Sequence, residues 1–504
     1  MTPPLRATWV PSQARRYRRP GGPWDVPTLD ALLVAHGGEV VDGHTRLSPA
    51  QVDALVAAVA GGLRERGARR GDVVAWQVPN SVAAAVLARA CWRLGAVAAP
   101  VLHSFGAADV QAALGQVDPR LVLDLPPQAL ADPGALEAAL GGAPMAAGDC
   151  PARPSDVALV LFTSGSTGVP KAVLHTHRGL SWMASLMARV HGLGPVDAVL
   201  VPTPMAHISG LLNGVLVPGA AGMRSVLVRR FDPEQALALV GRERVSFLAG
   251  PPTFFIAMGR AMAQGAPADV TSLRLVSSGG ANVTPAFVEE TARTFGCRVK
   301  RTYGSTEAPT VTTSTDDDPF DKARDTDGRA VGEVQLRVSD PGSGARCPTG
   351  SPGELWVRGP EMFAGYADRA QTAAVIAPGG WFRTSDLATV DAGGWVRIVG
   401  RLKDVIIRGG ENISASEVEA ALEAHPDVRH AVAVGYPDPL MGERVAAFVE
   451  STAPFDLEEC RRWFAGRGMA VFKTPEKVIV LQRLPLLGSG KADRAELRRR
   501  AAGG

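Results

Sequence analysis

The chain has 504 residues, more than one hydrophobic core of ordinary size supports, so we expect at least two domains. With 46 % hydrophobic and 20 % charged residues and a formal net charge of +3, the composition is that of a globular protein and excludes nucleic acid as the main partner. Five scattered cysteines without a C-x-x-C spacing indicate reduced thiols and exclude a disulfide framework or a structural zinc site. No apolar run suits a signal peptide or a spanning helix, so we expect a cytoplasmic protein without integral membrane association.

Helical and strand patterns alternate along the first part of the chain. Ser48 and Pro49 form an N-cap and a first helical position, and apolar residues then recur at helical spacing up to Leu63. Residues 73–78 are predicted as a strand and 83–94 as a buried helix. Further short apolar strands are predicted at 157–162, 246–249, 273–277 and 298–302. Strands separated by helices indicate mainly parallel sheets with helices packed on them.

The pattern changes near residue 353. Segments 354–358 and 395–399 have the character of short antiparallel strands between Gly- and Pro-rich turns, which predicts a small β-barrel-like part. After residue 400 helical patterns occur at 416–424, at 457–464 and from 494 onward, with strands at 431–434, 445–449 and 478–481. We therefore predict an α/β fold with a large N-terminal domain over residues 1–400 and a small α+β C-terminal domain over residues 401–504.

The segment from Leu161 to His177 carries the clearest chemical signal. A predicted strand leads into a loop that ends at Lys171 and holds six small or hydroxyl-bearing residues: Thr163, Ser164, Gly165, Ser166, Thr167 and Gly168. Small residues let backbone N–H groups turn toward an anion, the hydroxyls add donors, and the lysine adds a positive charge. Pro170 stands where a Walker A motif has glycine, so the loop predicts a polyphosphate site of another kind.

This loop resembles the phosphate-binding signature of the adenylate-forming (AMP-binding) superfamily, which includes acyl-CoA synthetases, amino-acid adenylation domains and beetle luciferases. Further segments resemble the family's other motifs, in the family's order: Tyr303-Gly304-Ser305-Thr306-Glu307, Thr384-Ser385-Asp386, GRLKDVIIRGGENI at 400–413, and Gly488-Ser489-Gly490-Lys491. The resemblance implies an ATP-dependent acyl-CoA ligase. Such an enzyme converts a carboxylic acid and ATP into acyl-AMP and pyrophosphate, and then passes the acyl group to the thiol of CoA.

The resemblance implies roles for the residues around the phosphates. Thr163 and Thr306 should donate to phosphate oxygens, and Lys171 should add its charge. Glu307 should hold Mg²⁺, because a hard cation that bridges phosphate oxygens needs a carboxylate ligand. Joining two anions is opposed by charge repulsion, so these groups should lower the main barrier to adenylation.

The nucleoside half of the site is implied by three separate segments. Tyr303, followed by Gly304, should stack on the adenine, whose other side should be lined by Gly279, Gly280 and Ala281. Asp386 can accept from the ribose hydroxyls, and Arg401 can reach the same sugar. Ser385 replaces the family's glycine before Asp386, so we expect ordinary backbone angles at this turn, without a positive φ.

The resemblance also implies a moving C-terminal domain. Lys491 should enter the site and contact the substrate carboxylate and phosphate during adenylation, so that closure completes the site. Lys403 occupies the hinge position. After adenylation the small domain should rotate, withdraw Lys491 and bring the Gly409-Gly410 loop to the thiol tunnel. His207 matches a position near the acyl pocket and this tunnel.

Other functions remain open at this stage. The second hypothesis is an acyl-AMP ligase that loads a separate acyl carrier protein, because no phosphopantetheine attachment segment follows Lys491. An amino-acid adenylating enzyme is less favoured, since no clear acidic residue stands beside His207 to hold an amine. A non-catalytic nucleotide-binding protein is disfavoured because Lys171, Glu307 and Lys491 are all present.

The acid is predicted only as a class. Trp182 and segments 207–212, 252–255 and 279–281 are apolar or small, which suits a neutral aliphatic or alicyclic acid. The N-terminal sequence is similar to that of cyclohexanecarboxylate-type ligases. A monomer or a homodimer is the expected state.

Overall fold

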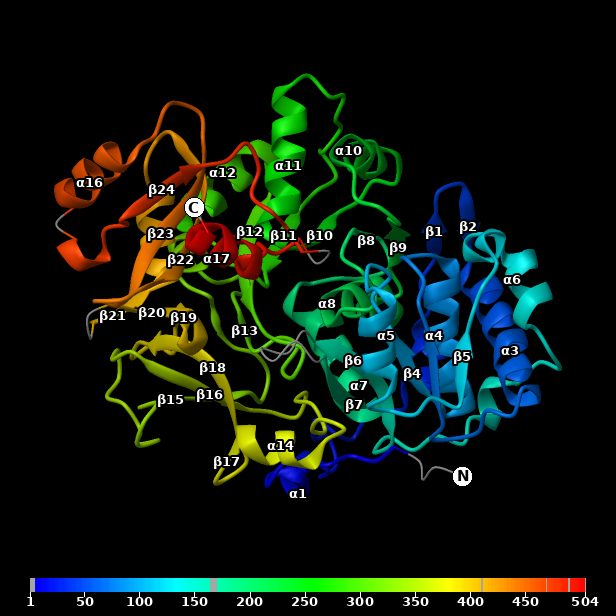
Figure 1. The fold of residues 1–504 in the computed structure, drawn as a ribbon. Coiled ribbons are helices and arrows are strands. Elements are labelled where there is room, and N and C mark those ends of the chain that lie inside the picture. The colour runs from blue at the N-terminus through cyan, green and yellow to red at the C-terminus, as the bar shows by residue number, and fades with distance from the viewer. Residues whose placement is uncertain (1–4, 164–169, 409–410, 468, 488–489, 504) are drawn as a thin grey trace.

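The computed structural model describes residues 5–503 apart from 164–169, 409–410, 468 and 488–489. Three sheets with their helices build a large N-terminal domain, and a fourth sheet builds a small C-terminal domain (Figure 1). The predicted α/β fold class is confirmed.

A five-stranded sheet in the order β5-β3-β4-β6-β7 forms one part of the large domain. Its strands are parallel except for β7, which runs antiparallel to β6 and sets Lys171 opposite Thr163. Ser48 caps α3 in a capping box with Gln51, as the sequence predicts. The elements are β3 (Val73–Trp76), β4 (Val97–Pro100), β5 (Leu121–Leu123), β6 (Val157–Thr163), β7 (Lys171–Thr176), α3 (Pro49–Glu65), α4 (Val82–Leu94), α5 (Ala107–Leu114), α6 (Pro133–Leu140), η1 (Pro127–Leu130) and η2 (Ala147–Asp149).

A nine-stranded sheet in the order β14-β13-β12-β11-β10-β8-β9-β1-β2 forms the second part. Its strands are β1 (Val40–Asp42), β2 (Thr45–Leu47), β8 (Ala198–Val201), β9 (Arg224–Leu227), β10 (Phe247–Gly250), β11 (Leu275–Gly279), β12 (Arg298–Tyr303), β13 (Thr312–Thr313) and β14 (Arg329–Ala330). Its helices are α2 (Leu29–His36), α7 (His177–Val190), α8 (Ile208–Leu211), η3 (Leu212–Leu216), α9 (Val217–Ala221), α10 (Pro233–Arg242), α11 (Pro252–Ala263), α12 (Pro285–Phe295) and α13 (Phe320–Asp325). Strands β1 and β8 to β12 are parallel, so β10, β11 and β12 end at the same edge.

The small all-β part of the large domain is a five-stranded antiparallel sheet. It contains β15 (Gln335–Ser339), β16 (Gly353–Arg358), β17 (Ile376–Ala377), β18 (Trp381–Val390) and β19 (Val396–Arg401), with α14 (Arg369–Val375) beside it. Its register sets Asp386 opposite Arg401. The N-terminal segment with α1 (Ala14–Tyr17) lies near α14 (Figure 1), and the backbone of Thr8 donates to Ala364.

The C-terminal domain has its own sheet, in the order β21-β20-β23-β22 with β24 parallel to β23. Its core contains Val418, Leu422, Val449 and Phe464, all buried. The elements are η4 (Leu402–Asp404), β20 (Val405–Arg408), β21 (Glu411–Ser414), α15 (Ala415–Glu423), β22 (Val428–Asp438), β23 (Gly442–Ser451), α16 (Leu457–Gly466), η5 (Val471–Lys473), β24 (Lys477–Val480) and α17 (Arg494–Gly503).

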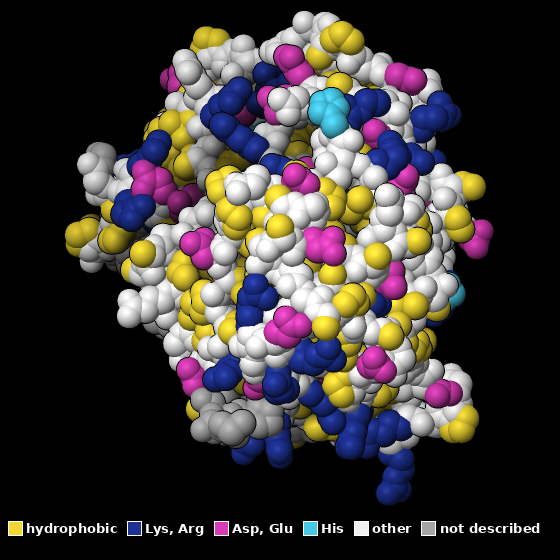
Figure 2. All heavy atoms as spheres, turned by 90° about the vertical axis from the view of Figure 1, so that its right-hand side faces the viewer, with side chains coloured by type: hydrophobic (Ala, Val, Ile, Leu, Met, Phe, Trp, Pro, Cys, Tyr) yellow, Lys and Arg dark blue, Asp and Glu magenta, His cyan; other side chains and the backbone are white. Residues whose placement is uncertain are grey.

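The surface is mixed in character. Figure 2 views the side on which α3 and α6 lie in Figure 1, and shows apolar, acidic and basic side chains interspersed over it, with basic side chains gathering along the lower edge. All five cysteines are free thiols, as predicted. Within the described ranges, no helix combines the length and the apolar character that crossing a bilayer requires.

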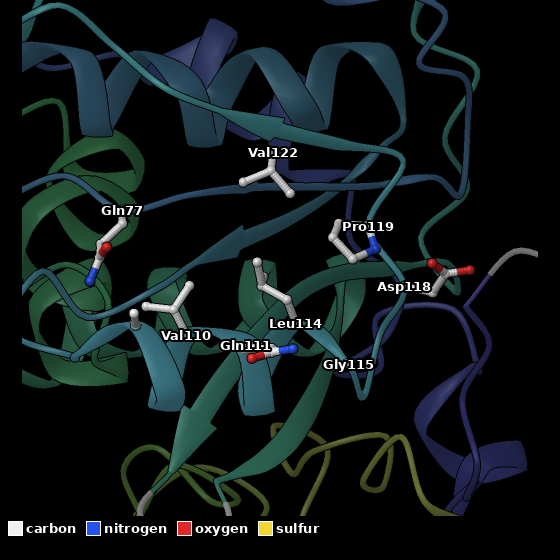
Figure 3. Close-up of a pocket in the computed structure, with 9 residues that line it drawn as sticks. Gln77, Val110, Gln111, Leu114, Gly115, Asp118, Pro119 and Val122 are labelled. Carbon is white, nitrogen blue, oxygen red and sulfur yellow. The ribbon is translucent and has the colours of Figure 1, made fainter.

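A groove with a volume of about 730 Å³ lies between α5 and β5, which is an edge strand. Val110 and Leu114 of α5 face Val122 of β5 across this groove (Figure 3). None of the predicted site residues lines it, so the groove is separate from the site described next.

Candidate active site

Two neighbouring strand ends bring the predicted adenine-binding residues together. Gly279 ends β11 and pairs with Thr302, next to Tyr303 at the end of β12. A Cβ added to Gly279 would lie 2.1 Å from the carbonyl oxygen of Thr302, so only glycine fits. Gly280 follows with a φ of +77°, and exposed Ala281 continues the turn.

Asp386 lies at the centre of a hydrogen-bonded triad. Its Oδ2 accepts from the Tyr303 hydroxyl at 2.7 Å, and its Oδ1 accepts from Arg401 Nε at 2.7 Å. The carboxylate is 3 % exposed. Burial first, and then the charge of Asp386, raise the pKa of Tyr303 well above its usual value, so the phenol keeps its proton and donates. The triad joins two sheets and presents one fixed carboxylate.

The backbone at Ser385 corrects an expectation from the sequence. Ser385 has a φ of +61°, so the prediction of ordinary angles there is wrong. A register shift between Glu354 and Trp356 makes a β-bulge opposite this turn. Ser385 N donates to Glu354 Oε1 at 3.2 Å, and Asp386 N donates to Thr384 Oγ1 at 3.0 Å. These bonds hold a non-glycine residue in a left-handed conformation beside the Asp386 carboxylate.

Glu307 is held by a residue that the sequence analysis missed. The Tyr366 hydroxyl donates to Glu307 Oε1 at 2.7 Å, and Phe363 N donates to the Glu307 carbonyl oxygen at 2.7 Å. The ammonium of Lys171 lies 5.0 Å from the centroid of the Tyr366 ring. Burial and the charge of Glu307 raise the pKa of Tyr366, which stays a donor. One phenol therefore connects the loop lysine with the carboxylate.

The turn from Gly304 to Glu307 is fixed from two sides. A Cβ on Gly304 would lie 2.1 Å from the carbonyl oxygen of Pro309, which leaves room only for glycine. His175, also missed from the sequence, donates from Nε2 to the Thr306 carbonyl oxygen at 2.8 Å. Burial lowers the pKa of His175 to about 4, so the ring is neutral at pH 7 and its protonated nitrogen faces the carbonyl.

Lys491 reaches this group from the C-terminal domain. A Cβ on Gly280 would lie 3.6 Å from Lys491 Cε, and Thr253 Oγ1 at the start of α11 donates to the Gly490 carbonyl oxygen at 3.0 Å. The Lys491 side chain is exposed to solvent, although many protein atoms lie around it. Burial first, and Arg401 next, lower the pKa of Lys491, while Asp386 and Glu307 act in the opposite direction. The lysine thus lies among the groups predicted to bind the nucleotide.

His207 precedes α8 and lies close enough to Lys491 to be affected by its charge. Its Nε2 is buried and has no hydrogen-bond partner among the described residues. Burial, and then Lys491 and His103, lower the pKa of His207 to about 4, so the ring is neutral at pH 7. Trp182 contacts a different region, near Gly332 and Arg189.

Several predicted residues lie outside the described ones: Ser164, Gly165, Ser166, Thr167, Gly168, Gly409 and Gly410. Thr163 and Lys171 flank the first gap as paired ends of β6 and β7. The backbone of Lys403 lies in η4, directly after Arg401, and its side chain is not described.

Comparisons with known proteins agree with this geometry. The profile of the family described as AMP-binding enzyme matches residues 33–367, and that of the AMP-binding enzyme C-terminal domain matches residues 417–491. The medium-chain fatty-acid–CoA ligase of Escherichia coli (strain K12) is 32 % identical over 91 % of this chain and 87 % of its own length. The feruloyl-CoA synthase of Amycolatopsis sp is 34 % identical over 95 % of this chain and 98 % of its own.

Solved structures agree as well. MatB from Rhodopseudomonas palustris with ATP bound superposes with a TM-score of 0.85 at 28 % identity, over 94 % of this chain and 98 % of that one. The apo structure of the same protein, at 29 % identity and equal coverage, gives a TM-score of 0.76.

The chain therefore belongs to the AMP-binding enzyme family. Within that family, its acyl-CoA ligase relatives confirm the predicted class, the AMP-forming acid–thiol ligases.

Proposed function

We propose that this site first joins a carboxylic acid to ATP, giving acyl-AMP and pyrophosphate, and then passes the acyl group to the thiol of CoA, releasing AMP. The observation that carries the proposal is the position of Lys491. A lysine from the C-terminal domain lies beside Gly280, among Arg401, Asp386 and Glu307. A cation in that place can bind both the carboxylate and the phosphate that must approach each other.

The nucleoside is held by the strand ends and the triad. Tyr303 and Gly304 lie against the adenine, with Gly279, Gly280 and Ala281 on its other side. The ribose hydroxyls donate to Asp386, whose oxygens retain free lone pairs beside the bonds from Tyr303 and Arg401. Both bonds hold the carboxylate in place before ATP binds, so little side-chain entropy is lost there on binding.

The phosphates bind between Thr163, Thr306, Lys171 and the loop 164–168. Glu307 fits a role as Mg²⁺ ligand, because Oε1 accepts from Tyr366 while Oε2 has no hydrogen-bond partner in the described part of the chain. No group of three or more metal-ligating side chains occurs among the described residues, which suits an ion held chiefly by phosphates and water. When bound, Mg²⁺ neutralises phosphate charge and orients the phosphates.

Two arrangements of the C-terminal domain serve the two half-reactions. We propose that residues 401–504 rotate relative to residues 1–400 about Lys403, which withdraws Lys491 and brings Gly409 and Gly410 to the thiol tunnel. The two MatB structures come from the same organism but differ in TM-score to this chain, 0.85 with ATP and 0.76 without. The better fit to the ATP-bound structure supports the proposal that the two domains of this chain lie in the arrangement used for the ATP-dependent step.

The acid is proposed to be apolar. The relatives named above act on medium-chain fatty acids and on ferulate, both carboxylates with a large apolar part. His207 is neutral and adds no charge to the pocket, so a neutral aliphatic, alicyclic or aryl acid is favoured over an amino acid.

A pyrophosphate-release assay over a panel of acids tests the proposal: short, medium and long fatty acids, cyclohexanecarboxylate, benzoates, ferulate and amino acids, each with and without CoA. We expect release that CoA stimulates with one class of apolar acid, together with acyl-CoA as product. Release that CoA does not stimulate would instead indicate a carrier protein as acceptor. No release with any acid of the panel would contradict the proposal.

A further inference from the structure

Contacts between the two domains lie on both sides of the reaction site and outside the nucleotide-binding residues. We propose that Arg260, with Ser414 and Ser416, forms an interdomain latch that holds Lys491 in place for adenylation and must open before the thiol step. The inference rests on the proposed function, because it assigns residues to the change between the two half-reactions.

The first half of the latch is an ion pair near the Lys491 segment. Arg260 on α11 donates from Nη2 to Glu450 Oε2 of β23 at 2.9 Å. The other oxygen of Glu450 accepts from Leu484 N at 2.9 Å, and Glu450 itself is 9 % exposed. Leu484 begins the segment that leads to Lys491. The carboxylate therefore ties that segment to α11 through a single side chain.

The same segment meets α11 a second time, at its first turn. A Cβ on Gly490 would lie 3.2 Å from Pro251 Cγ and 3.2 Å from Thr253 Oγ1, so the chain next to Lys491 is pressed against α11. Gly490 also has a φ of +80°, which favours glycine. Arg260 lies near the C-terminal end of α11 and Thr253 near its N-terminal end. Contacts at both ends of the helix therefore position the segment that carries Lys491.

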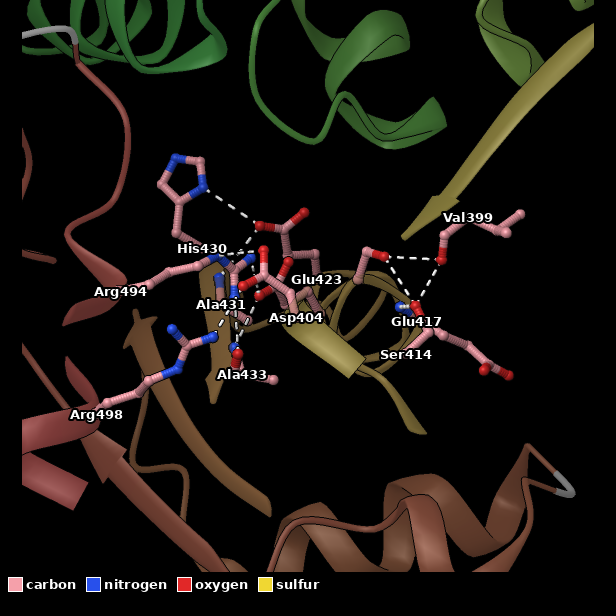
Figure 4. Close-up of polar contacts among 12 residues, drawn as sticks. Val399, Asp404, Ser414, Glu417, Glu423, His430, Ala431, Ala433, Arg494 and Arg498 are labelled. Carbon is pink, nitrogen blue, oxygen red and sulfur yellow. Dashed lines mark hydrogen bonds and ion pairs between the residues drawn. The ribbon is translucent and has the colours of Figure 1, made fainter. Parts of the chain in front are cut away.

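The second half of the latch lies at the hinge. The hydroxyl oxygens of Ser414 and Ser416 lie 2.5 and 2.9 Å from the Val399 carbonyl oxygen, to which each can donate, and 2.9 Å from each other. Figure 4 shows the Ser414 side chain pointing at the carbonyl of Val399. A Cβ on Gly400 would lie 2.7 Å from Ser414 Oγ, so the serines sit directly on strand β19.

Rotation about Lys403 must break both halves. Val399 precedes Lys403 and the two serines follow it, while Arg260 and Glu450 lie in different domains. By contrast, Arg498 donates to Asp404 at 2.8 Å and Arg494 donates to Glu419 at 2.5 Å, and all four residues follow Lys403 (Figure 4). Both ion pairs lie within the C-terminal domain and move with it, so they stay formed in both domain arrangements.

The test compares half-reactions in charge-altered variants. Adenylation is measured as single-turnover pyrophosphate release with MgATP and the acid identified by the panel, and thiolation as acyl-CoA formation from isolated acyl-AMP. We expect Arg260→Glu, and Ser414→Ala with Ser416→Ala, to slow adenylation about three- to tenfold while thiolation is unchanged or faster. Arg260→Lys should restore most of the adenylation rate.

Arg324→Glu is the matched control, because Arg324 pairs with Glu289 at 2.7 Å within one domain and is 31 % exposed, like Arg260. It should leave the ratio of the two half-reactions unchanged. An equal change of both half-reactions in Arg260→Glu, or no change in either, would overturn the latch.

A second readout needs no acid and therefore separates failure of the latch from failure of the proposed function. Dyes at positions 196 and 471, which are 96 % and 88 % exposed and lie one in each domain, report the domain arrangement by single-molecule energy transfer. We expect Arg260→Glu with MgATP to move molecules out of the population that dominates in the parent protein. An unchanged distribution would contradict the latch. The labelled protein carries serine at the three partly exposed cysteines: Cys150, Cys297 and Cys347.

Discussion

Both carboxylates of the site are held by tyrosine hydroxyls. Tyr303 donates to Asp386 and Tyr366 donates to Glu307, each at 2.7 Å. A phenol that keeps its proton at all relevant pH values is a fixed donor, so it orients the carboxylate before the nucleotide arrives. Asp386 accepts at both oxygens and keeps free lone pairs, whereas Glu307 accepts from the described residues only at Oε1, so each carboxylate can take a further partner without reorganisation.

Tyr366→Phe should weaken the binding of MgATP. The variant keeps the ring under Lys171 but loses the bond to Glu307, and a hydrogen bond to a charged group contributes about 1.5–3 kcal/mol. We expect MgATP affinity, measured by calorimetry without acid, to fall about ten- to a hundredfold. Tyr436→Phe in the C-terminal domain is the control. Parent-like affinity in Tyr366→Phe would show that Glu307 needs no such support.

Glu361 predicts a pH dependence of stability. It is 0 % exposed, and neither carboxylate oxygen has a hydrogen-bond partner among the described residues. Burial raises the pKa of Glu361 to about 8. Between the unfolded value of about 4.5 and this folded value, the unfolded chain has released the proton and the native chain retains it. This group therefore lowers stability as pH rises through that range, and its effect is absent at acid pH.

Glu361→Gln should remove this effect. At pH 7 we expect the variant to be more stable by about 1–3 kcal/mol, with the gain vanishing near pH 4.5. Denaturant unfolding at several pH values measures it. A gain that is equal at pH 5 and pH 8 would mean that folding does not raise the pKa of Glu361.

At the scale of elements, the sequence predicted where the site residues would meet. Parallel strands were expected to end near Gly279 and Tyr303, and they end side by side at one edge of the nine-stranded sheet. Local patterns also predicted the strand before Thr163 and the capping of α3 by Ser48. These features are set by residues close together in the chain, so they can be predicted from a single sequence.

The features that were missed depend on distant parts of the chain. Tyr366 contacts Glu307 because the segment after β16 runs along β7, where Tyr366 bridges to Val173, and no motif marks it. Ser385 takes its positive φ from a bulge whose partner, Glu354, lies 31 residues away. His175 is one of several histidines, and only its burial and its bond to Thr306 distinguish it.

The hinge yields a prediction at this scale. Lys403→Pro in η4 should slow thiolation more than adenylation, because proline restricts the backbone rotation that separates the two arrangements. The two half-reactions, measured separately as above, give the ratio. Equal loss of both steps would indicate local damage to η4 and no hinge function.

At the scale of the whole molecule, the proposed site includes a residue from the C-terminal domain, Lys491. Lys491 lies 90 positions after Arg401 in the sequence, yet it reaches Gly280 because the C-terminal domain docks on α11 and β19. A site assembled by docking can be opened without unfolding either domain.

The measurement that tests the account most directly is the pair of half-reactions in Lys491→Ala. Removing a cation that acts on developing charge should slow adenylation by about 100-fold or more, while acyl-CoA formation from isolated acyl-AMP should stay within a few-fold of the parent rate. Equal loss of both half-reactions, or retention of adenylation, would contradict the assignment of Lys491 to the first step.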